Sequence, residues 1–207
     1  MQEIHLVGIN HKTSKVSDRE RFIVDDSNII YLNDYLLSKL GSKISGFFGL
    51  STCNRTEIYY YGDEGIDLDV LKLTKEALNI SDIPDKNFYI YNDKDAFEHM
   101  CRVCCGIDSQ VVGEQEIFGQ FKNAFRSAKA FNIVSKELTL YVEKVFEITK
   151  KVRTDTKIGI NPLSVSGLSF NLVREIFEKP EDKKVLVIGG GHCLLYTSPS
   201  PRDGLLS

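Results

Sequence analysis

The apolar positions of this chain change their spacing along its length. Ile4 to Ile9 reads as a strand, and two further strand-like runs, Gly46 to Leu50 and Ile58 to Tyr61, flank a short polar segment. A fourth run lies at Phe88 to Tyr91. Short apolar runs that are bounded by polar or turn residues are typical of strands with little exposed surface.

Between these runs the spacing is helical. Ser17 with Glu20 forms a capping-box pattern, which predicts a short helix through Phe22 and Ile23. The other expected helices are one capped by Ser27 and ended by Gly41, one starting at Asp67 or Asp69, and one opened by Asp93 or Lys94 that carries His99. The resulting βααββαβα order predicts an α+β fold, with a mixed or antiparallel sheet and helices on one of its faces.

From Ile117 onward the chain is predicted to be almost entirely helical. One amphipathic run covers 138–152, and Pro162, a favourable first helical residue, begins a second run that reaches Glu178. Residues 179–182 then form a short linker. An apolar strand from Lys184 leads into three glycines, Gly189, Gly190 and Gly191, but position 194 holds a leucine where a dinucleotide-binding fingerprint would have its third glycine.

Composition narrows the choice of partners. The 207 residues are 42% hydrophobic and carry a net charge of −3, so a general basic surface for nucleic acid is excluded and a local patch would be needed. The candidates for such a patch are Lys122, Arg126, Lys129, Lys144, Lys150, Lys151, Arg153 and Lys157. Solvated helix faces have the same composition, and that alternative stays open.

Five cysteines are present, and their pattern favours an intracellular, reducing setting. Cys101-x-x-Cys104 has the spacing of a redox or zinc motif, yet a second pair at metal spacing is missing unless His99 and Cys105 contribute. Residues three apart share a helix face, so we expect these thiols to pack in the core and predict no metal site. The sequence has no apolar run long enough to span a membrane.

One cysteine has very different neighbours. Cys53 lies in the polar segment Ser51-Thr52-Cys53-Asn54-Arg55-Thr56-Glu57, at the turn between two expected strands. A nearby cation such as Arg55 favours the reactive thiolate, and loops between strands often present reactive groups. The alternative is an inert, half-buried cysteine in a polar hairpin.

A second polar stretch, residues 106–120, reads GIDSQVVGEQEIFGQ and runs into the helix that starts near Ile117. Its donors and acceptors suit a small substrate that carries an amine and a carboxylate. Taken by itself, the stretch could equally be a helix N-terminus whose acidic residues complement the helix dipole.

Together these segments resemble the glutamyl-tRNA reductase family. The opening VGINHKTS of residues 7–14, the STCNRTE segment, His99, the 106–120 segment and the strand Val185–Gly189 occur in the order seen in that family, from the start to about Gly191. The resemblance implies NADPH-dependent reduction of the glutamyl group on its tRNA to glutamate-1-semialdehyde, the first step of tetrapyrrole (porphyrin) biosynthesis, in the cytoplasm.

The resemblance also implies roles for particular residues. Cys53 would be the nucleophile that forms a thioester and later the leaving group, and His99 would move a proton or position the substrate. Arg55 would bind the side-chain carboxylate of the glutamyl group. Glu114 and Glu116 would bind the ammonium of the same group. The remaining implied contacts are Thr52, Asn54, Ser109, Gln115 and Gln120, and His11 has weaker support. Many family members have glutamine where Glu116 stands here.

By the same resemblance, residues 1–160 form the catalytic glutamyl-binding domain and 161–182 a spine-like linker helix. Residues 183–191 begin an NADPH-binding domain at Gly189, Gly190 and Gly191, and we expect 192–207 to be a foreign, disordered tail. The implied partners are glutamyl-tRNA, the downstream aminomutase and, in the full-length family, a second copy. With the cofactor domain incomplete, we expect this chain to be limited to forming and hydrolysing the thioester. Two alternatives remain: a non-enzymatic tRNA-binding or regulatory module, and a redox module that uses Cys101 and Cys104.

Overall fold

A four-stranded antiparallel sheet organises the computed structural model, which describes residues 1–156, 158 and 172–177. The strands are β1 (Gln2–Asn10), β2 (Ile44–Ser51), β3 (Arg55–Asp63) and β4 (Tyr89–Asn92), in the order β2-β3-β1-β4. Asn10 at the end of β1 pairs with Arg55 at the start of β3, and Ser51 at the end of β2 pairs with Thr56. The ends of β1 and β2 and the beginning of β3 therefore meet at one end of the sheet.

Six α-helices accompany this sheet within residues 1–156. They are α1 (Val16–Arg19), α2 (Ile29–Leu40), α3 (Asp67–Ala77), α4 (Asp93–Cys104), α5 (Glu116–Ala130) and α6 (Lys136–Thr156). Two 3-10 helices, η1 (Gly41–Lys43) and η2 (Asp85–Asn87), precede β2 and β4. The observed order from β1 to α4 is the βααββαβα order expected from the sequence, and the α+β class is confirmed.

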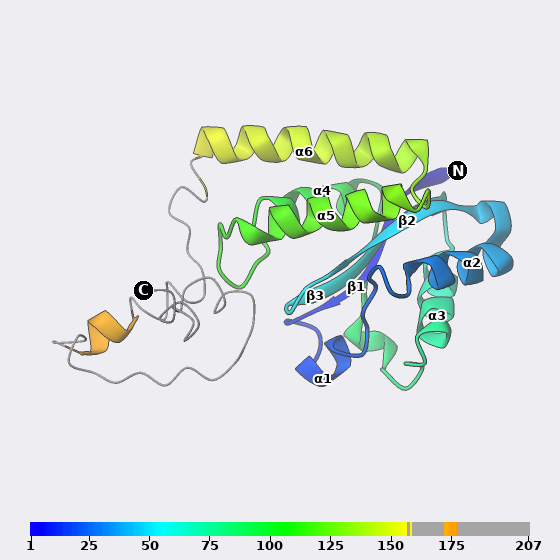
Figure 1. Ribbon diagram of the computed structural model, residues 1–207, viewed down its shortest axis with the longest axis horizontal. Helices are drawn as coiled ribbons and strands as arrows, with labels where there is room; N and C mark the ends of the chain where they lie inside the picture. Colours follow the sequence, from blue (N-terminus) through cyan, green and yellow to red (C-terminus); the bar gives the residue numbers. More distant parts are fainter. Residues whose placement is uncertain (157, 159–171, 178–207) are drawn as a thin grey trace, which may run out of the picture.

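Helices cover both faces of the sheet rather than one (Figure 1). Tyr59 and Tyr60 are neighbours on β3 and are both fully buried, although adjacent strand residues point to opposite faces. Tyr59 packs against Phe121 of α5, with ring centroids 5.3 Å apart, while the hydroxyl of Tyr60 donates to Asp67 of α3 at 2.6 Å. Because apolar residues occupy successive strand positions, both faces of the sheet are apolar and both are buried by helices.

The covering helices form layers. α4 and α5 pack on one face of the sheet, with α6 stacked outside them, and α2 and α3 pack on the other face (Figure 1). The loop between α4 and α5, residues 105–115, returns to the end of the sheet where β3 begins. This arrangement brings the two polar segments of the sequence analysis to the same end of the molecule.

Two of the predicted helix starts differ from the structure. α1 ends at Arg19 and does not extend through Phe22 and Ile23, and its N-cap is Lys15 without a side-chain bond, so the Ser17–Glu20 capping box does not form. α2 begins after Asn28, because Ser27 is held in a turn by the carboxylate of Asp25. Its end at Gly41, in a backbone conformation with φ of 57°, is as expected.

The predicted run from Pro162 to Glu178 has only residues 172–177 among the described ones, where 172–176 are helical. The NADPH-binding segment, with Gly189, Gly190 and Gly191, and the tail 192–207 lie outside the described residues. None of the helices in the described ranges combines the length and the apolar character needed to cross a membrane.

Candidate active site

The turn of the β2–β3 hairpin presents Cys53. Thr52 organises this turn: its backbone N–H donates to the carbonyl of Arg55 at 2.8 Å, and its hydroxyl oxygen accepts from the N–H groups of Asn54 and Arg55, each at 3.2 Å. A hydroxyl that bonds the backbone two and three residues on is typical of Thr in tight turns. With its backbone fixed in this way, the side chain of Cys53 is exposed.

The segment after β1 braces the same turn. The N–H of His11 donates to the carbonyl of Asn54 at 2.9 Å. The buried Arg19 donates to the carbonyl of Cys53 at 3.4 Å and to that of Ser14 at 2.7 Å. Burial and the neighbouring cations, Lys12 first among them, lower the pKa of His11, so its ring is neutral at pH 7. Arg19 was not predicted, because its sequence position gives no sign that it folds back onto the hairpin.

Arg55 lies inside the protein, not at the surface beside the thiol. Its side chain is 1% exposed, and it donates to Glu57 Oε1 at 3.0 Å, to Asp108 Oδ2 at 3.1 Å and to the backbone carbonyl of Asp108. Burial lowers the pKa of the guanidinium, and the charge of Glu57 and its neighbours outweighs this effect and raises it above the ordinary value. Arg55 therefore joins the hairpin to the loop that carries Ser109.

Glu57 is the centre of this buried network. It accepts hydrogen bonds from Arg55, from His99 Nε2 at 2.7 Å, from the hydroxyl of Tyr89 at 2.5 Å and from that of Tyr59. Burial alone would raise the pKa of Glu57, but His99 and Arg55 reverse the effect and hold it well below the ordinary value. The carboxylate of Glu57 is therefore ionised.

His99 is not a helix-surface histidine. It is 9% exposed, and its ring lies 5.0 Å from that of Tyr91 and 5.7 Å from that of Tyr89, between centroids. Glu57 connects it to Arg55. Glu57 was absent from the predicted site, although the alternation of Arg55, Glu57 and Tyr59 along an apolar strand puts two charges on a buried face and could have indicated it.

The loop 105–115 is compact because two glycines close it. Gly106 and Gly113 have φ of 75° and 87°, and the N–H of Gly113 donates to the carbonyl of Gly106 at 2.9 Å. From α6, Arg153 donates to the carbonyls of Cys104 and Glu114 at 3.2 and 3.0 Å and lies over the ring of Phe118. The loop thereby holds the buried Ser109 next to Asp108.

The remaining predicted contacts lie at the start of α5. Gln115 precedes the helix, Glu116 begins it, and the amide of Gln120 donates to Glu116 at 3.4 Å. Gln120 also lines a cavity of about 560 Å³ together with Ser51 at the end of β2, residues 24–27 and Ile29. Glu114 contributes its backbone carbonyl to the anchoring of the loop by Arg153.

A second cavity, of about 370 Å³, lies against the network on the β4 side. Its walls are Asn10, Lys12, Thr13, Tyr89, Tyr91, Asp95, Glu98, His99, Arg102 and Asp108. Lys12 reaches Asp108 from one side at 2.6 Å, while Arg55 holds the same carboxylate from the protein interior. Lys12, from the segment after β1, and Arg55, from β3, therefore converge on Asp108 in the loop 105–115.

In the part of the chain that the structure describes, the other cysteines are Cys101, Cys104 and Cys105, and each is at least partly buried. Cys104 belongs to the hydrophobic core, and burial raises its pKa well above the ordinary value; burial also raises the pKa of Cys101 to about 11. High pKa values disfavour the thiolates that redox exchange and metal binding require. Within the described ranges, His, Cys, Asp and Glu side chains form no group of three or more suited to a metal ion. The packing hypothesis for Cys104 is confirmed.

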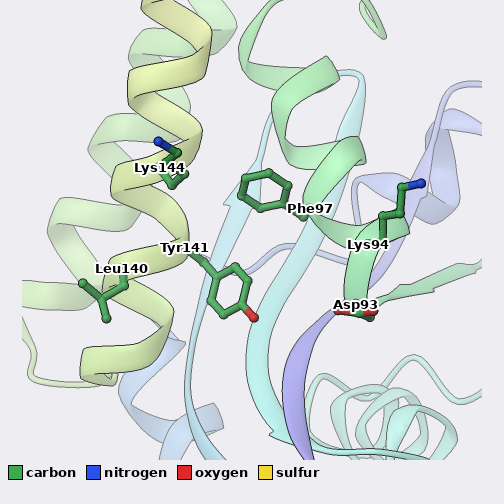
Figure 2. A pocket seen from close by; sticks show the side chains of 6 residues that line it. All are labelled: Asp93, Lys94, Phe97, Leu140, Tyr141 and Lys144. Atoms are coloured by element: carbon green, nitrogen blue, oxygen red, sulfur yellow. The ribbon is translucent and has the colours of Figure 1, made fainter.

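A further, mostly apolar cavity lies away from this site, between α4 and α6 (Figure 2). It measures about 380 Å³ and is lined by Asp93, Lys94, Phe97, Leu140, Tyr141 and Lys144. Asp93 begins α4, whereas the loop 105–115 follows the other end of that helix. The two are therefore separated by the length of α4, roughly 18 Å for twelve residues.

The fold and the site define a class of protein: an α+β domain that presents a cysteine on a hairpin turn, next to a buried network of arginine, glutamate and histidine. Residues 7–156 match the model of the family described as "Glutamyl-tRNAGlu reductase, N-terminal domain". The chain belongs to the glutamyl-tRNA reductase family.

Individual relatives agree with this assignment. The chain is 36% identical over 192 residues to the glutamyl-tRNA reductase of Colwellia psychrerythraea and 36% identical over 190 residues to that of Marinobacter nauticus. Each match covers 91% of this chain and 45% or 44% of the relative, so the chain spans less than half the length of these proteins. The solved structure of glutamyl-tRNA reductase from Methanopyrus kandleri is similar, with a TM-score of 0.66 at 27% identity, covering 93% of this chain and 45% of that one.

Proposed function

We propose that this chain carries the glutamyl-transfer site of a glutamyl-tRNA reductase, with Cys53 as the nucleophile. The observation that carries the proposal is the exposed thiol at the braced turn of the β2–β3 hairpin, within the segment that matches the family domain. The partner is glutamyl-tRNA, and the full-length protein is proposed to be a cytoplasmic homodimer that acts before an aminomutase.

The chemistry follows from the thiol. The sulfur of Cys53 attacks the carbonyl carbon of the aminoacyl ester, a C–S bond forms, and the C–O bond to the tRNA ribose breaks. The thiol proton ends on the released ribose hydroxyl. In the hydrolysis that we propose for this chain, water then cleaves the thioester and the thiolate leaves.

NADPH, when bound, supplies the hydride that converts such a thioester to an aldehyde. Its predicted contacts, Gly189, Gly190 and Gly191, are outside the described residues, so the described site accounts only for acyl transfer. In the full-length enzyme Cys53 would act as the leaving group in that step as well.

The residues around Cys53 divide into holding and binding roles. Thr52 and Asn54 fix the turn, and both are also proposed substrate contacts, along with Ser109, Gln115 and Gln120. Glu114 and Glu116 are proposed to bind the ammonium group. Arg55 is proposed to bind the glutamyl carboxylate by a two-pronged contact, which requires a change in its present pairing with Asp108.

His99 is proposed to be the proton-transferring group of the site. A histidine is suited to this role at neutral pH, and the carboxylate of Glu57 orients the ring through its contact with Nε2. The proposed reaction therefore has a nucleophile on the hairpin and an acid on α4, joined through Arg55 and Glu57.

The test is acylation of the purified chain by glutamyl-tRNA, read by intact-protein and peptide mass spectrometry. We expect one glutamyl group on the peptide that contains Cys53, no adduct on Cys53→Ala, and an unchanged adduct on Cys101→Ala. An unmodified Cys53 at saturating glutamyl-tRNA would contradict the proposal.

The competing function is a tRNA-binding module without chemistry. It predicts that tRNA binding persists in Cys53→Ser while no variant ever forms an adduct. A gel-shift titration of the same preparations distinguishes the two, because binding without an adduct supports the module and an adduct excludes it.

A further inference from the structure

Asp108 lies between two cations that come from different parts of the chain. Lys12 Nζ is 2.6 Å from one carboxylate oxygen and Arg55 Nη2 is 3.1 Å from the other. The Arg55 side chain is 1% exposed, that of Asp108 is 12% exposed and that of Lys12 is 57% exposed. Asp108 thus forms the boundary between a buried guanidinium and an open cavity.

Of the two carboxylates that neutralise Arg55, only Asp108 is free to leave. Glu57 is fully buried and held by His99, Tyr59 and Tyr89 as well as by Arg55. Asp108 lies on a loop and in the wall of the 370 Å³ cavity, and its only side-chain partners in the described ranges are Lys12 and Arg55. Displacement of Asp108 would open the path from this cavity to Arg55.

The departing carboxylate must be replaced by another one. An arginine that loses one of its counter-charges in a buried site is strongly destabilised, so a neutral ligand cannot take the place of Asp108. A carboxylate can, and Lys12 at the cavity wall would then contact it as it now contacts Asp108. The exchange conserves charge and leaves the bond from Arg55 to Glu57 intact.

We propose that Asp108 is a resting counter-ion that occupies the site of the substrate's side-chain carboxylate, and that Lys12 and Arg55 together bind that carboxylate once Asp108 is displaced. The inference rests on the proposed function and adds Lys12 and Asp108 to it as specificity-determining residues. It predicts discrimination against a glutaminyl group, because an amide carries no charge to replace that of Asp108.

The experiment measures the half-saturating concentration of glutamyl-tRNA for acylation of Cys53, in the unmodified chain, Lys12→Gln, Asp108→Asn and the double variant. Asp108→Asn keeps the backbone carbonyl that Arg55 binds, which favours correct folding. Lys15→Gln and Asp95→Asn are matched controls, since Lys15 is an exposed lysine three positions after Lys12 and Asp95 lines the same cavity.

We expect Asp108→Asn to lower the half-saturating concentration and Lys12→Gln to raise it, each about fivefold, the change that about 1 kcal/mol gives for a partly exposed ion pair. Lys12→Gln should still raise it in the Asp108→Asn background, because Lys12 binds the substrate directly. If Lys12 matters only when Asp108 is present, or if Asp95→Asn acts as strongly as Asp108→Asn, the proposal is wrong.

A second titration separates this inference from the proposed function. Glutarate, a simple dicarboxylate, is titrated into the same variants and its binding is followed by the NMR signals of the arginine side chains. Tighter binding to Asp108→Asn and weaker binding to Lys12→Gln support the exchange even if Cys53 is never acylated. Acylation of Cys53 together with unaltered glutarate affinities would overturn the exchange and leave the proposed function standing.

Discussion

Nε2 of His99 lies 2.7 Å from Oε1 of Glu57, although 42 positions separate the two residues along the chain. The pair links α4 to the centre of the sheet, and the same Glu57 oxygen accepts a hydrogen bond from Arg55. Arg55, Glu57 and His99 therefore form one buried, hydrogen-bonded unit.

Removing the charge of Glu57 should therefore destabilise the whole unit. Glu57→Gln leaves Arg55 with one carboxylate and puts a neutral amide beside His99, and breaking a buried ion pair such as Arg55–Glu57 costs about 3–5 kcal/mol. We expect a loss of at least about 3 kcal/mol in the free energy of unfolding, measured by urea denaturation. Glu98→Gln, on the exposed face of α4, should change stability by less than about 0.5 kcal/mol. An equal effect of the two variants would contradict the central role of Glu57.

Acid should weaken the fold through the same carboxylate. The pKa of Glu57 is held below its ordinary value of 4.5 in the folded protein, and those of Asp67 and Asp108 are held below 3.8. As pH falls below 4.5 the unfolded chain takes up protons that the folded chain does not, so stability decreases with falling pH. Urea unfolding at a series of pH values should show this slope, and Glu57→Gln should reduce it. A pH-independent free energy of unfolding across this range would be inconsistent with the network.

The loop 105–115 should tolerate a methyl group poorly at its first glycine. At Gly106 the φ of 75° is unfavourable for an L-residue, and an added Cβ would lie 2.7 Å from the carbonyl oxygen of Glu114. We expect Gly106→Ala to lower the free energy of unfolding by about 1–2 kcal/mol or more and to slow acylation of Cys53. Gly119→Ala is the matched control, because its Cβ would meet no described atom within 4 Å and alanine favours the helix by up to about 1 kcal/mol. Thermal unfolding of both variants decides the matter: similar shifts in Tm would refute the strain at Gly106.

Arg153 should couple α6 to the substrate loop. Its two hydrogen bonds, to the carbonyls of Cys104 and Glu114, are lost in Arg153→Met, while a side chain of similar length remains to cover the ring of Phe118. We expect a destabilisation of about 1–3 kcal/mol and faster amide hydrogen exchange in 105–115, because those carbonyls lose their charged donor. Lys150→Met, at an exposed position on the same helix, is the control. Unchanged exchange in the loop would show that Arg153 does not hold it.

The order of strands and helices was predictable because each element has a local signature. Ile4 to Ile9 is a mostly apolar run, Gly41 ends α2 with a positive φ, and Asp93 opens α4 as expected. The capping box at Ser17 and the cap at Ser27 were not realised. In both places the backbone makes other turns, and at Ser27 the carboxylate of Asp25 takes the hydroxyl and N–H that the prediction had assigned to the helix.

The position of Cys53 followed from its neighbours along the chain, but the direction of Arg55 did not. A guanidinium two residues from a thiol could point to either face of the strand, and its buried partners, Glu57 and Asp108, are 2 and 53 positions away. Burial of His99 depended in the same way on the packing of α4 over β4 and β1, which no local pattern encodes.

By itself the sequence determined the succession of elements, the polar hairpin with its cysteine and the family to which the chain belongs, since these depend on the spacing and identity of residues that are close along the chain. Only the tertiary structure decided that helices cover both faces of the sheet, that Arg55 turns inward, and that Lys12, Asp108, Glu57 and His99 meet in one network. The physical reason is that charge pairing and burial depend on distance in space, and the folded chain brings together loops and strands that are far apart in sequence.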